Sequence, residues 1–150
     1  MGRVLAVDYG TRRVGIAVSD PTATIAQPLT VLTRREGKRP PVQAVADIAA
    51  EQRAQHIVIG LPLGLDGEEN DWTREVRAFG AKLGERTGLG VTFADERLTS
   101  VVAERAVRSL GLKRSRREEK ERVDAAAAVL ILQRHLDAMK SVTRRESEPE

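Results

Sequence analysis

The sequence predicts one α/β domain in which a mixed five-stranded sheet carries helices on both faces. Three observations support this fold class. The chain begins with the pattern of an antiparallel meander, the segments that follow alternate helical stripes with short apolar strands, and 150 residues with 41% hydrophobic content suffice for one core but not for two substantial domains. A meander that leads into crossover helices produces a mixed sheet. We expect the domain to span residues 1–140, followed by a polar, disordered tail over residues 141–150.

The predicted meander consists of three strands, at Val4–Asp8, Val14–Ser19 and Ala26–Thr33. The first two are rich in branched residues, and the residues between them, from Tyr9 to Arg13, are typical of a hairpin turn. The third strand follows at hairpin distance. All three strands should therefore pair antiparallel.

The next two predicted elements are a helix and a buried strand. Apolar residues recur at helical spacing over Val42–Gln55. The short, continuous apolar run His56–Gly60 then predicts a strand that is covered on both faces. This change from helix to strand marks the start of the crossover part of the fold.

A second helix and a last strand complete the predicted sheet. Asn70 or Asp71 can cap a helix that runs to about Arg86. The run Val91–Ala94 predicts the strand that follows, and it leads directly into Asp95 and Glu96.

Two helices are predicted after the last strand. Thr99 or Ser100 can cap the first, which should end near Leu110 before Gly111. The second should begin at Ser115, which has Glu118 three residues later, the spacing of a capping box. Its middle is an apolar run over residues 123–132 that only Asp124 interrupts, so we expect it to be mostly buried.

The composition excludes several kinds of chemistry. Cysteine is absent, which excludes a disulfide framework, a thiolate nucleophile and a cysteine-based zinc site. We recognise no leader pattern and no apolar stretch of membrane-spanning length. We therefore expect a cytoplasmic protein without a membrane partner, present as a monomer or weak homodimer.

Positive charge is concentrated in two short segments of a chain with a net charge of only +3. The segments 34–39 and 113–122 each carry a local excess of +3. Such clusters indicate a polyanionic partner, because neutralising phosphate groups releases counterions and so favours binding. From the charge alone, two solvated loops are an equally good interpretation. The basic residues of the two segments are Arg34, Arg35, Lys38, Arg39, Lys113, Arg114, Arg116, Arg117, Lys120 and Arg122.

Three acidic residues interrupt apolar patterns: Asp8 ends the first strand, Glu96 ends the last strand, and Asp124 lies in the final helix. An ionised carboxylate in apolar surroundings costs several kcal/mol unless a cation or good donors compensate it. Hard oxygen ligands in cysteine-free, histidine-poor surroundings favour Mg²⁺ or Mn²⁺ over zinc. The sequence therefore predicts a metal site and catalytic centre formed by Asp8, Glu96 and Asp124.

Each acid also has a structural alternative. Asp8 could cap the turn at Gly10, Glu96 could pair with Arg97 or Arg105, and Asp124 could pair with Lys120 one helical turn earlier. Taken together the three favour a site, because strand ends in sheets with crossover helices are common places for one. Asp95 remains an alternative to Glu96, because neighbouring strand residues face opposite sides.

Other conspicuous residues carry less information. The loop Gly60–Gly67 lies between a strand and a helix, where backbone N–H groups can meet phosphate, but we favour the interpretation as a plain connecting loop. His56 and His135 are far apart in the sequence and have no evident partner, so we assign neither to a site.

Four stretches of the chain form a recognisable set: Val7–Asp20, Gly60–Leu63 with Asp66-Gly67, Asp95–Ser100, and Asp124–Ala128 with Ile131-Leu132. The first and third are specific in combination. With these stretches the chain resembles the YqgF family, also called RuvX, of Holliday-junction-resolvase-like and pre-ribosomal-RNA nucleases.

The resemblance implies an RNase H-like fold and a metal-dependent nuclease that hydrolyses phosphodiester bonds, with Asp8, Glu96 and Asp124 as its acidic triad. It implies a nucleic acid as partner, with RNA preferred and DNA possible, and a role in processing the 5′ end of precursor small-subunit ribosomal RNA. We expect the basic segment 113–122 and further residues of the matching stretches to contact phosphate or to support the residues of the site. The expected nucleic-acid-binding residues are Arg13, Arg97, Thr99, Lys113, Arg114, Arg116 and Arg117.

Two alternative functions follow from the same residues. RuvC-type resolvases, which the chain resembles in fold, carry two aspartates three apart on the last helix. Here Ala127 lies three residues after Asp124 and Glu121 three before it. The fourth acid is therefore either missing or replaced by a glutamate, which argues against junction resolution. A Holliday junction resolvase is kept as an alternative function, and a non-catalytic nucleic-acid-binding domain is another. An ATPase of the actin and sugar-kinase type would need two lobes, which 150 residues cannot supply.

Overall fold

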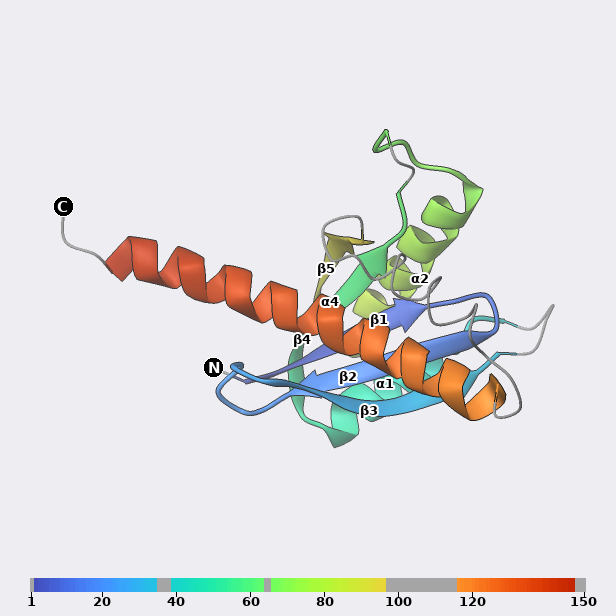
Figure 1. Cartoon of the computed structure of the whole chain (residues 1–150), viewed down its shortest axis with the longest axis horizontal. Helices are drawn as coiled ribbons and strands as arrows, with labels where there is room; N and C mark the ends of the chain where they lie inside the picture. The colour runs from blue at the N-terminus through green and yellow to red at the C-terminus, as the bar shows by residue number, and fades with distance from the viewer. Residues whose placement is uncertain (1, 35–38, 64–65, 97–115, 148–150) are drawn as a thin grey trace.

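A five-stranded sheet with the strand order β3-β2-β1-β4-β5 forms the centre of the computed structural model (Figure 1). The structure describes residues 2–34, 39–63, 66–96 and 116–147, with the backbone alone for 116–124 and 142–147. Its elements are β1 (Arg3–Tyr9), β2 (Arg13–Ser19), β3 (Ala26–Thr33), α1 (Val42–Glu51), β4 (Ala54–Leu61), α2 (Asp71–Thr87), β5 (Gly90–Asp95) and α4 (Arg116–Ser147).

The strand directions confirm the predicted mixed sheet. β1 pairs antiparallel with β2, and β2 pairs antiparallel with β3. β4 and β5 join on the other side of β1 as parallel strands, reached through α1 and α2. The carboxyl ends of β1, β4 and β5 therefore meet at one edge of the sheet.

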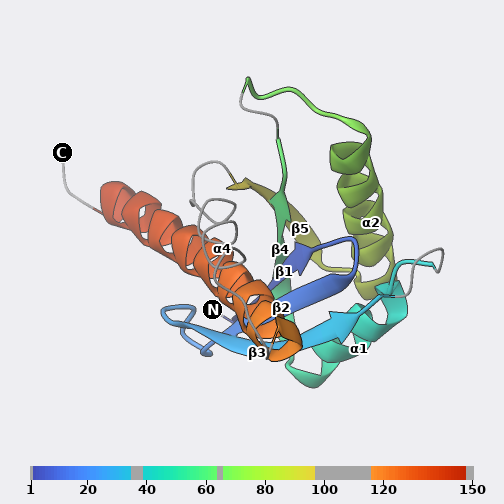
Figure 2. The ribbon, with the colours of Figure 1, turned by 45° about the vertical axis from the view of Figure 1, so that its right-hand side comes forward.

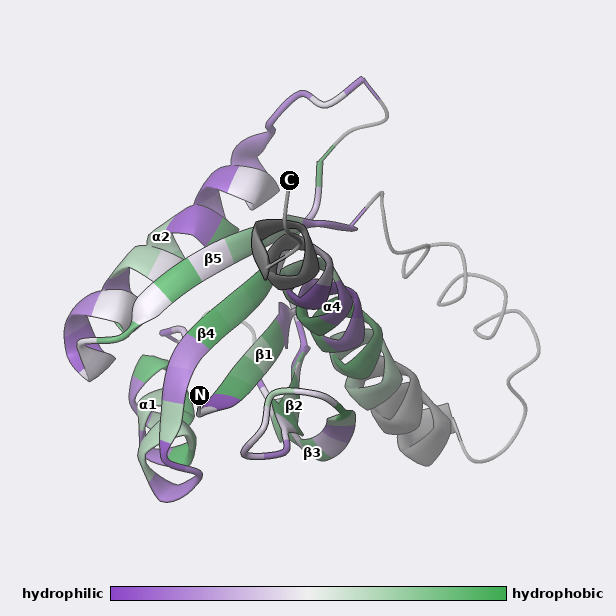
Figure 3. Ribbon diagram, turned by 90° about the vertical axis from the view of Figure 1, so that its left-hand side faces the viewer, coloured by the Kyte–Doolittle hydropathy of each residue, from purple (hydrophilic) through white to green (hydrophobic). Residues whose placement is uncertain are grey.

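The two faces of the sheet are covered by different helices (Figure 2). Alternate residues of β1 divide between two hydrophobic clusters, with Leu5 and Val7 in the cluster shared with α1 and α2, and Val4 and Ala6 in the cluster shared with α4. Apolar residues line the central strands and the middle of α4 where these elements face one another (Figure 3). The predicted placement of helices on both faces is confirmed.

The predicted end of the first helix was wrong. α1 ends at Glu51 rather than continuing to Gln55, and β4 begins at Ala54. Arg53 between them has a φ of 55°, in the left-handed region, which a right-handed helix cannot accommodate. This single residue therefore redirects the chain from helix into strand.

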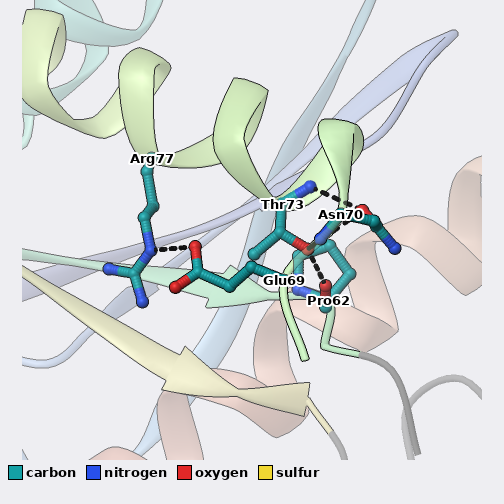
Figure 4. A network of polar contacts seen from close by, with 5 residues as sticks. All are labelled: Pro62, Glu69, Asn70, Thr73 and Arg77. Carbon is teal, nitrogen blue, oxygen red and sulfur yellow. Dashed lines mark hydrogen bonds and ion pairs between the residues drawn. The ribbon is translucent and has the colours of Figure 1, made fainter. Parts of the chain in front are cut away.

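The predicted cap of the second helix is confirmed. The Asn70 side chain accepts a hydrogen bond of 2.9 Å from the backbone N–H of Thr73, and the Thr73 hydroxyl accepts one from the backbone N–H of Asn70 (Figure 4). The same hydroxyl donates to the Pro62 carbonyl oxygen at 2.6 Å. α2 is thus tied to the residues that leave β4. Gly88 ends α2 with a φ of 72°.

The last helix, α4, packs across β2, β3 and β1 on one face of the sheet (Figure 1). It continues through Ser147, so residues 141–147 of the predicted tail are helical, and its final turns project beyond the sheet. The helix predicted between Thr99 and Leu110 and the predicted start at Ser115 lie outside the described residues. Among the described helices, none is long and apolar enough to cross a membrane.

Candidate active site

Asp8 lies at the end of β1 on the face that α4 covers. Its side chain follows the alternation of Val4 and Ala6, which both pack in the α4 cluster. Only 3% of Asp8 is exposed. The chain therefore buries a carboxylate at the edge of the sheet where three parallel strands end.

Glu96 lies on the same face, against β4. A Cβ atom on Gly60 would be 2.8 Å from Oε1 of Glu96 and 2.6 Å from Cδ1 of Ile131 in α4. Gly60 follows Ile59, which pairs with Val7, so Gly60 and Asp8 are neighbours on adjacent strands. Glu96 is 5% exposed. Two buried carboxylates therefore lie over the carboxyl ends of β1 and β4.

Asp95 and Glu96 lie on opposite faces of the sheet. Phe93 packs in the cluster with α1 and α2, whereas Ala94 packs in the cluster with α4. By strand alternation Asp95 lies on the Phe93 side, and Glu96 lies on the side of Asp8. Glu96 is the acid that shares a face with Asp8.

The third predicted acid, Asp124, lies within α4, but its side chain is outside the described part. Within the described residues no group of three acidic, histidine or cysteine side chains forms a metal site. Arg13 begins β2 and is partly exposed beside the β1–β2 turn. The side chains of the other predicted nucleic-acid contacts lie outside the described residues: Arg97, Thr99, Lys113, Arg114, Arg116 and Arg117.

An arginine and three aromatic rings pack beneath the turn that follows Asp8. Tyr9 stacks on Phe79 with ring centroids 4.3 Å apart and on Trp72 at 5.4 Å. The guanidinium carbon of Arg34 lies 4.6 Å from the centre of the Tyr9 ring. Burial raises the pKa of the Tyr9 hydroxyl, and the Arg34 charge partly opposes that shift.

Arg34 is therefore built into the structure, although the positive charge of residues 34–39 suggests a polyanion contact. Only 10% of the Arg34 side chain is exposed, and it donates to the Gly10 carbonyl oxygen. Arg39 is exposed, and residues 35–38 lie outside the described part.

The sequence pattern of a known family covers almost the whole chain. The family described as "RuvX: Holliday junction resolvase" matches residues 2–138. The chain belongs to the RuvX family.

Relatives of the chain carry a consistent name. A protein from Chloroflexus aurantiacus named "Putative pre-16S rRNA nuclease" is 40% identical over 148 residues, which cover 97% of this chain and 93% of the relative. A protein of the same name from Koribacter versatilis is 43% identical over 136 residues, covering 91% of this chain and 87% of the relative.

Solved structures establish the fold of this RuvX-family chain. RuvC of Thermus thermophilus in complex with a Holliday junction substrate superposes with a TM-score of 0.56 at 15% identity, covering 93% of this chain and 96% of that one. A second T. thermophilus RuvC structure gives a TM-score of 0.55 at 14% identity over the same shares of both chains. The predicted RNase H-like fold is confirmed.

Sequence reasoning missed one pair of residues. The rings of His56 and His135 stack 5.8 Å apart, with their planes 12° from parallel. His56 Nε2 also lies 2.7 Å from the Thr92 hydroxyl. Because His56 pairs with Val4 at the start of the sheet, this pair lies at the opposite end of β4 from Gly60. Burial lowers the pKa of both rings, and the neighbouring His56 lowers that of His135 further.

Proposed function

We propose that this chain is a divalent-metal-dependent nuclease that processes the 5′ end of precursor small-subunit ribosomal RNA in the cytoplasm. The observation that carries the proposal is the placement of Asp8 and Glu96, two buried carboxylates on one face of the sheet beside Gly60. We propose that Asp124 completes the set. It lies two helical turns before Ile131, and a spacing of seven residues returns to nearly the same side of a helix.

The donor set fits Mg²⁺ or Mn²⁺. Carboxylate oxygens are the ligands that these ions prefer, cysteine is absent from the sequence, and both histidines lie at the other end of β4. A bound ion would supply an activated water molecule and stabilise the charge that develops on the phosphate. Asp8 and Glu96 would hold the ion at the sheet edge, and their burial would strengthen each electrostatic contact there.

Two observations favour RNA trimming over junction resolution. The relatives carry the name of a pre-16S rRNA nuclease. In addition, all four aromatic side chains are engaged within the protein, since Tyr9, Trp72 and Phe79 stack together and Arg77 lies over the ring of Phe93. The chain therefore offers few rings for unstacking bases, and recognition should depend on backbone charge.

Cleavage of matched substrates tests the proposal. Single-stranded RNA, single-stranded DNA, duplex DNA and a mobile four-way junction would each be incubated with the full chain and either Mg²⁺ or Mn²⁺. We expect metal-dependent cleavage with single-stranded RNA as the best substrate. Symmetric nicking of the junction at rates well above RNA cleavage would favour a resolvase, for which the family description and the RuvC-like fold are the supporting observations. Binding without cleavage would favour a non-catalytic nucleic-acid-binding domain.

A further inference from the structure

Arg34 joins the end of β3 to the turn that follows Asp8. Its backbone N–H donates to the carbonyl oxygen of Arg12 at 2.6 Å, and its Nη1 donates to the carbonyl oxygen of Gly10 at 2.9 Å. The turn itself is closed by a hydrogen bond of 2.9 Å from the Gly10 N–H to the Arg13 carbonyl oxygen. Arg34 thus binds the turn at two separate carbonyl groups.

The same guanidinium also fixes the residue next to Asp8. It lies 4.6 Å from the centre of the Tyr9 ring, within the range of a cation–π contact. Tyr9 is held from α2 by Phe79 and Trp72. Glu75, also on α2, lies 3.8 Å from Nη2 of Arg34, but its side chain is 47% exposed, so this ion pair adds little.

Two buried polar atoms belong to this arrangement. Nε of Arg34 and the hydroxyl of Tyr9 have no hydrogen-bond partner among the described residues. A buried donor without a partner costs about 1–3 kcal/mol. Apart from the weak ion pair with Glu75, the contacts of Arg34 are with Tyr9, Gly10 and Arg12, which belong to the turn that follows Asp8.

We propose that Arg34 is a positioning residue of the metal site: by holding Tyr9 and both sides of the β1–β2 turn, it holds the Asp8 carboxylate in register with Glu96. This inference rests on the proposed function, because it assigns a role toward the ion that Asp8 and Glu96 would bind. Residues that orient metal ligands affect metal affinity by about 10-fold to 100-fold.

Calorimetric titration of the full chain with Mn²⁺ tests this role. Arg34→Met should weaken Mn²⁺ binding about tenfold or more, while circular dichroism shows an intact fold. Arg34→Lys keeps the charge over Tyr9 but not the planar fork, so it should recover part of the affinity. Mn²⁺ binding by both variants as tight as in the unmodified chain would overturn the proposal. If Arg34→Met does not fold, Arg34→Lys decides: weakened binding supports the role and unchanged binding overturns it.

Two control variants separate positioning from general stability. Val45→Ala removes buried volume in α1, on the other face of the sheet, and should lower the melting temperature without changing Mn²⁺ affinity. Arg74→Met removes an exposed cation that pairs with Asp71, and it should change neither quantity appreciably. If Val45→Ala weakens Mn²⁺ binding as much as Arg34→Met, Arg34 acts only through stability and the proposal is wrong.

Failure of the proposed function gives a different result. In that case the unmodified chain does not bind Mn²⁺, or Asp8→Asn binds it equally well. Amide hydrogen exchange still reports on Arg34, because the Gly10 N–H closes the turn. Faster exchange of the Gly10 N–H in Arg34→Met would support the structural part of the inference, namely that Arg34 holds the β1–β2 turn. Unchanged exchange would overturn that part as well.

Discussion

Oε1 of Glu96 lies 2.8 Å from the position that a Cβ atom on Gly60 would occupy. Real Cβ atoms do not approach other atoms so closely, so the absence of a side chain at this point of β4 is what allows Glu96 to lie against the sheet. Cδ1 of Ile131 uses the same space from α4, at 2.6 Å from that position. Gly60 therefore leaves the space against β4 that the Glu96 carboxylate and the end of the Ile131 side chain occupy.

Gly60→Ala should displace the Glu96 carboxylate. Metal binding, and with it cleavage, should be affected more strongly than the stability of the fold. We expect a decrease of about 1–3 kcal/mol in the free energy of unfolding, typical of an overpacked core, with a larger fractional decrease in metal affinity. Urea unfolding and Mn²⁺ titration measure the two effects. Gly84→Ala in α2 is the control, because its Cβ would be 3.4 Å from the nearest atom. The free energy of unfolding of this variant should increase by about 0.5–1 kcal/mol. Unchanged metal affinity in Gly60→Ala would contradict the geometry described for Glu96.

Asp8→Asn should abolish cleavage while leaving the fold and nucleic-acid binding largely intact. Removing one of two buried carboxylates on the same face relieves repulsion, so the melting temperature without metal should be unchanged or higher. Added Mn²⁺ should raise the melting temperature of the unmodified chain and not that of the variant, because a bound ion stabilises the folded state.

The control for Asp8→Asn is Asp47→Asn, which neutralises an exposed carboxylate that accepts a hydrogen bond from Gln43 on α1. It should cleave normally and keep the stabilisation by Mn²⁺. Cleavage undiminished in Asp8→Asn would remove Asp8 from the proposed site.

Local patterns predicted the sheet well because strand pairing here follows from nearby turns and buried apolar runs. β3 has the predicted bounds, Ala26–Thr33, and the Asn70 cap is present. The end of α1 was missed because Arg53 adopts a left-handed conformation that is uncommon for a residue other than glycine, asparagine or aspartate. Propensities and periodicity carry no signal for such a residue.

The site could be predicted only in part. The burial of Asp8 and Glu96 was implied by the apolar patterns that they interrupt, but the face on which Glu96 lies depends on Gly60, in a neighbouring strand. The contacts of Arg34 with Gly10 and Tyr9 and the stacking of His56 on His135 join residues that are distant in sequence. No spacing rule relates such residues, because the sheet and α4 bring them together.

The histidine pair predicts a pH dependence of stability. Burial lowers the pKa of both rings below 6.5 in the folded state, so the unfolded chain binds more protons as the pH falls through 6.5. Stability should be fully present above about pH 6.5 and should decrease as the pH falls toward the folded-state pKa values. His135→Phe keeps a ring to stack on His56 but cannot take up a proton.

Melting temperatures between about pH 7.5 and 5.5 measure this effect. The melting temperature should decrease less on acidification in His135→Phe than in the unmodified chain, because one of the two histidines with a lowered pKa is gone. Gln133→Glu is unsuitable as a control, since Gln133 binds the Thr24–Ala26 segment through two hydrogen bonds. Asp47→Asn, which changes an exposed carboxylate on α1, should leave the pH profile unchanged. If the melting temperature falls equally steeply with decreasing pH in His135→Phe and in the unmodified chain, the prediction for the histidine pair is wrong.

The basic segment at the start of α4 is the last element that the proposed function needs. Arg116 and Arg117 begin this helix, before Asp124 and on the same helix as Ile131, which lies beside Gly60. A cationic segment so placed would hold the phosphate backbone near the acidic residues. Replacing Arg114, Arg116 and Arg117 together by alanine should weaken binding to all nucleic-acid sequences alike, because phosphate contacts do not read bases.

The salt dependence of binding gives the quantitative test of this segment. The slope of the logarithm of the binding constant against the logarithm of salt concentration should become shallower by about 0.7–0.9 for each phosphate group that the protein no longer neutralises. Arg74→Ala with Arg86→Ala serves as the control, because both side chains lie on α2, across the sheet from α4, and are exposed. The control pair should leave the slope unchanged. A slope that is equally unchanged in the triple variant would mean that these arginines are solvated and that another surface binds the backbone.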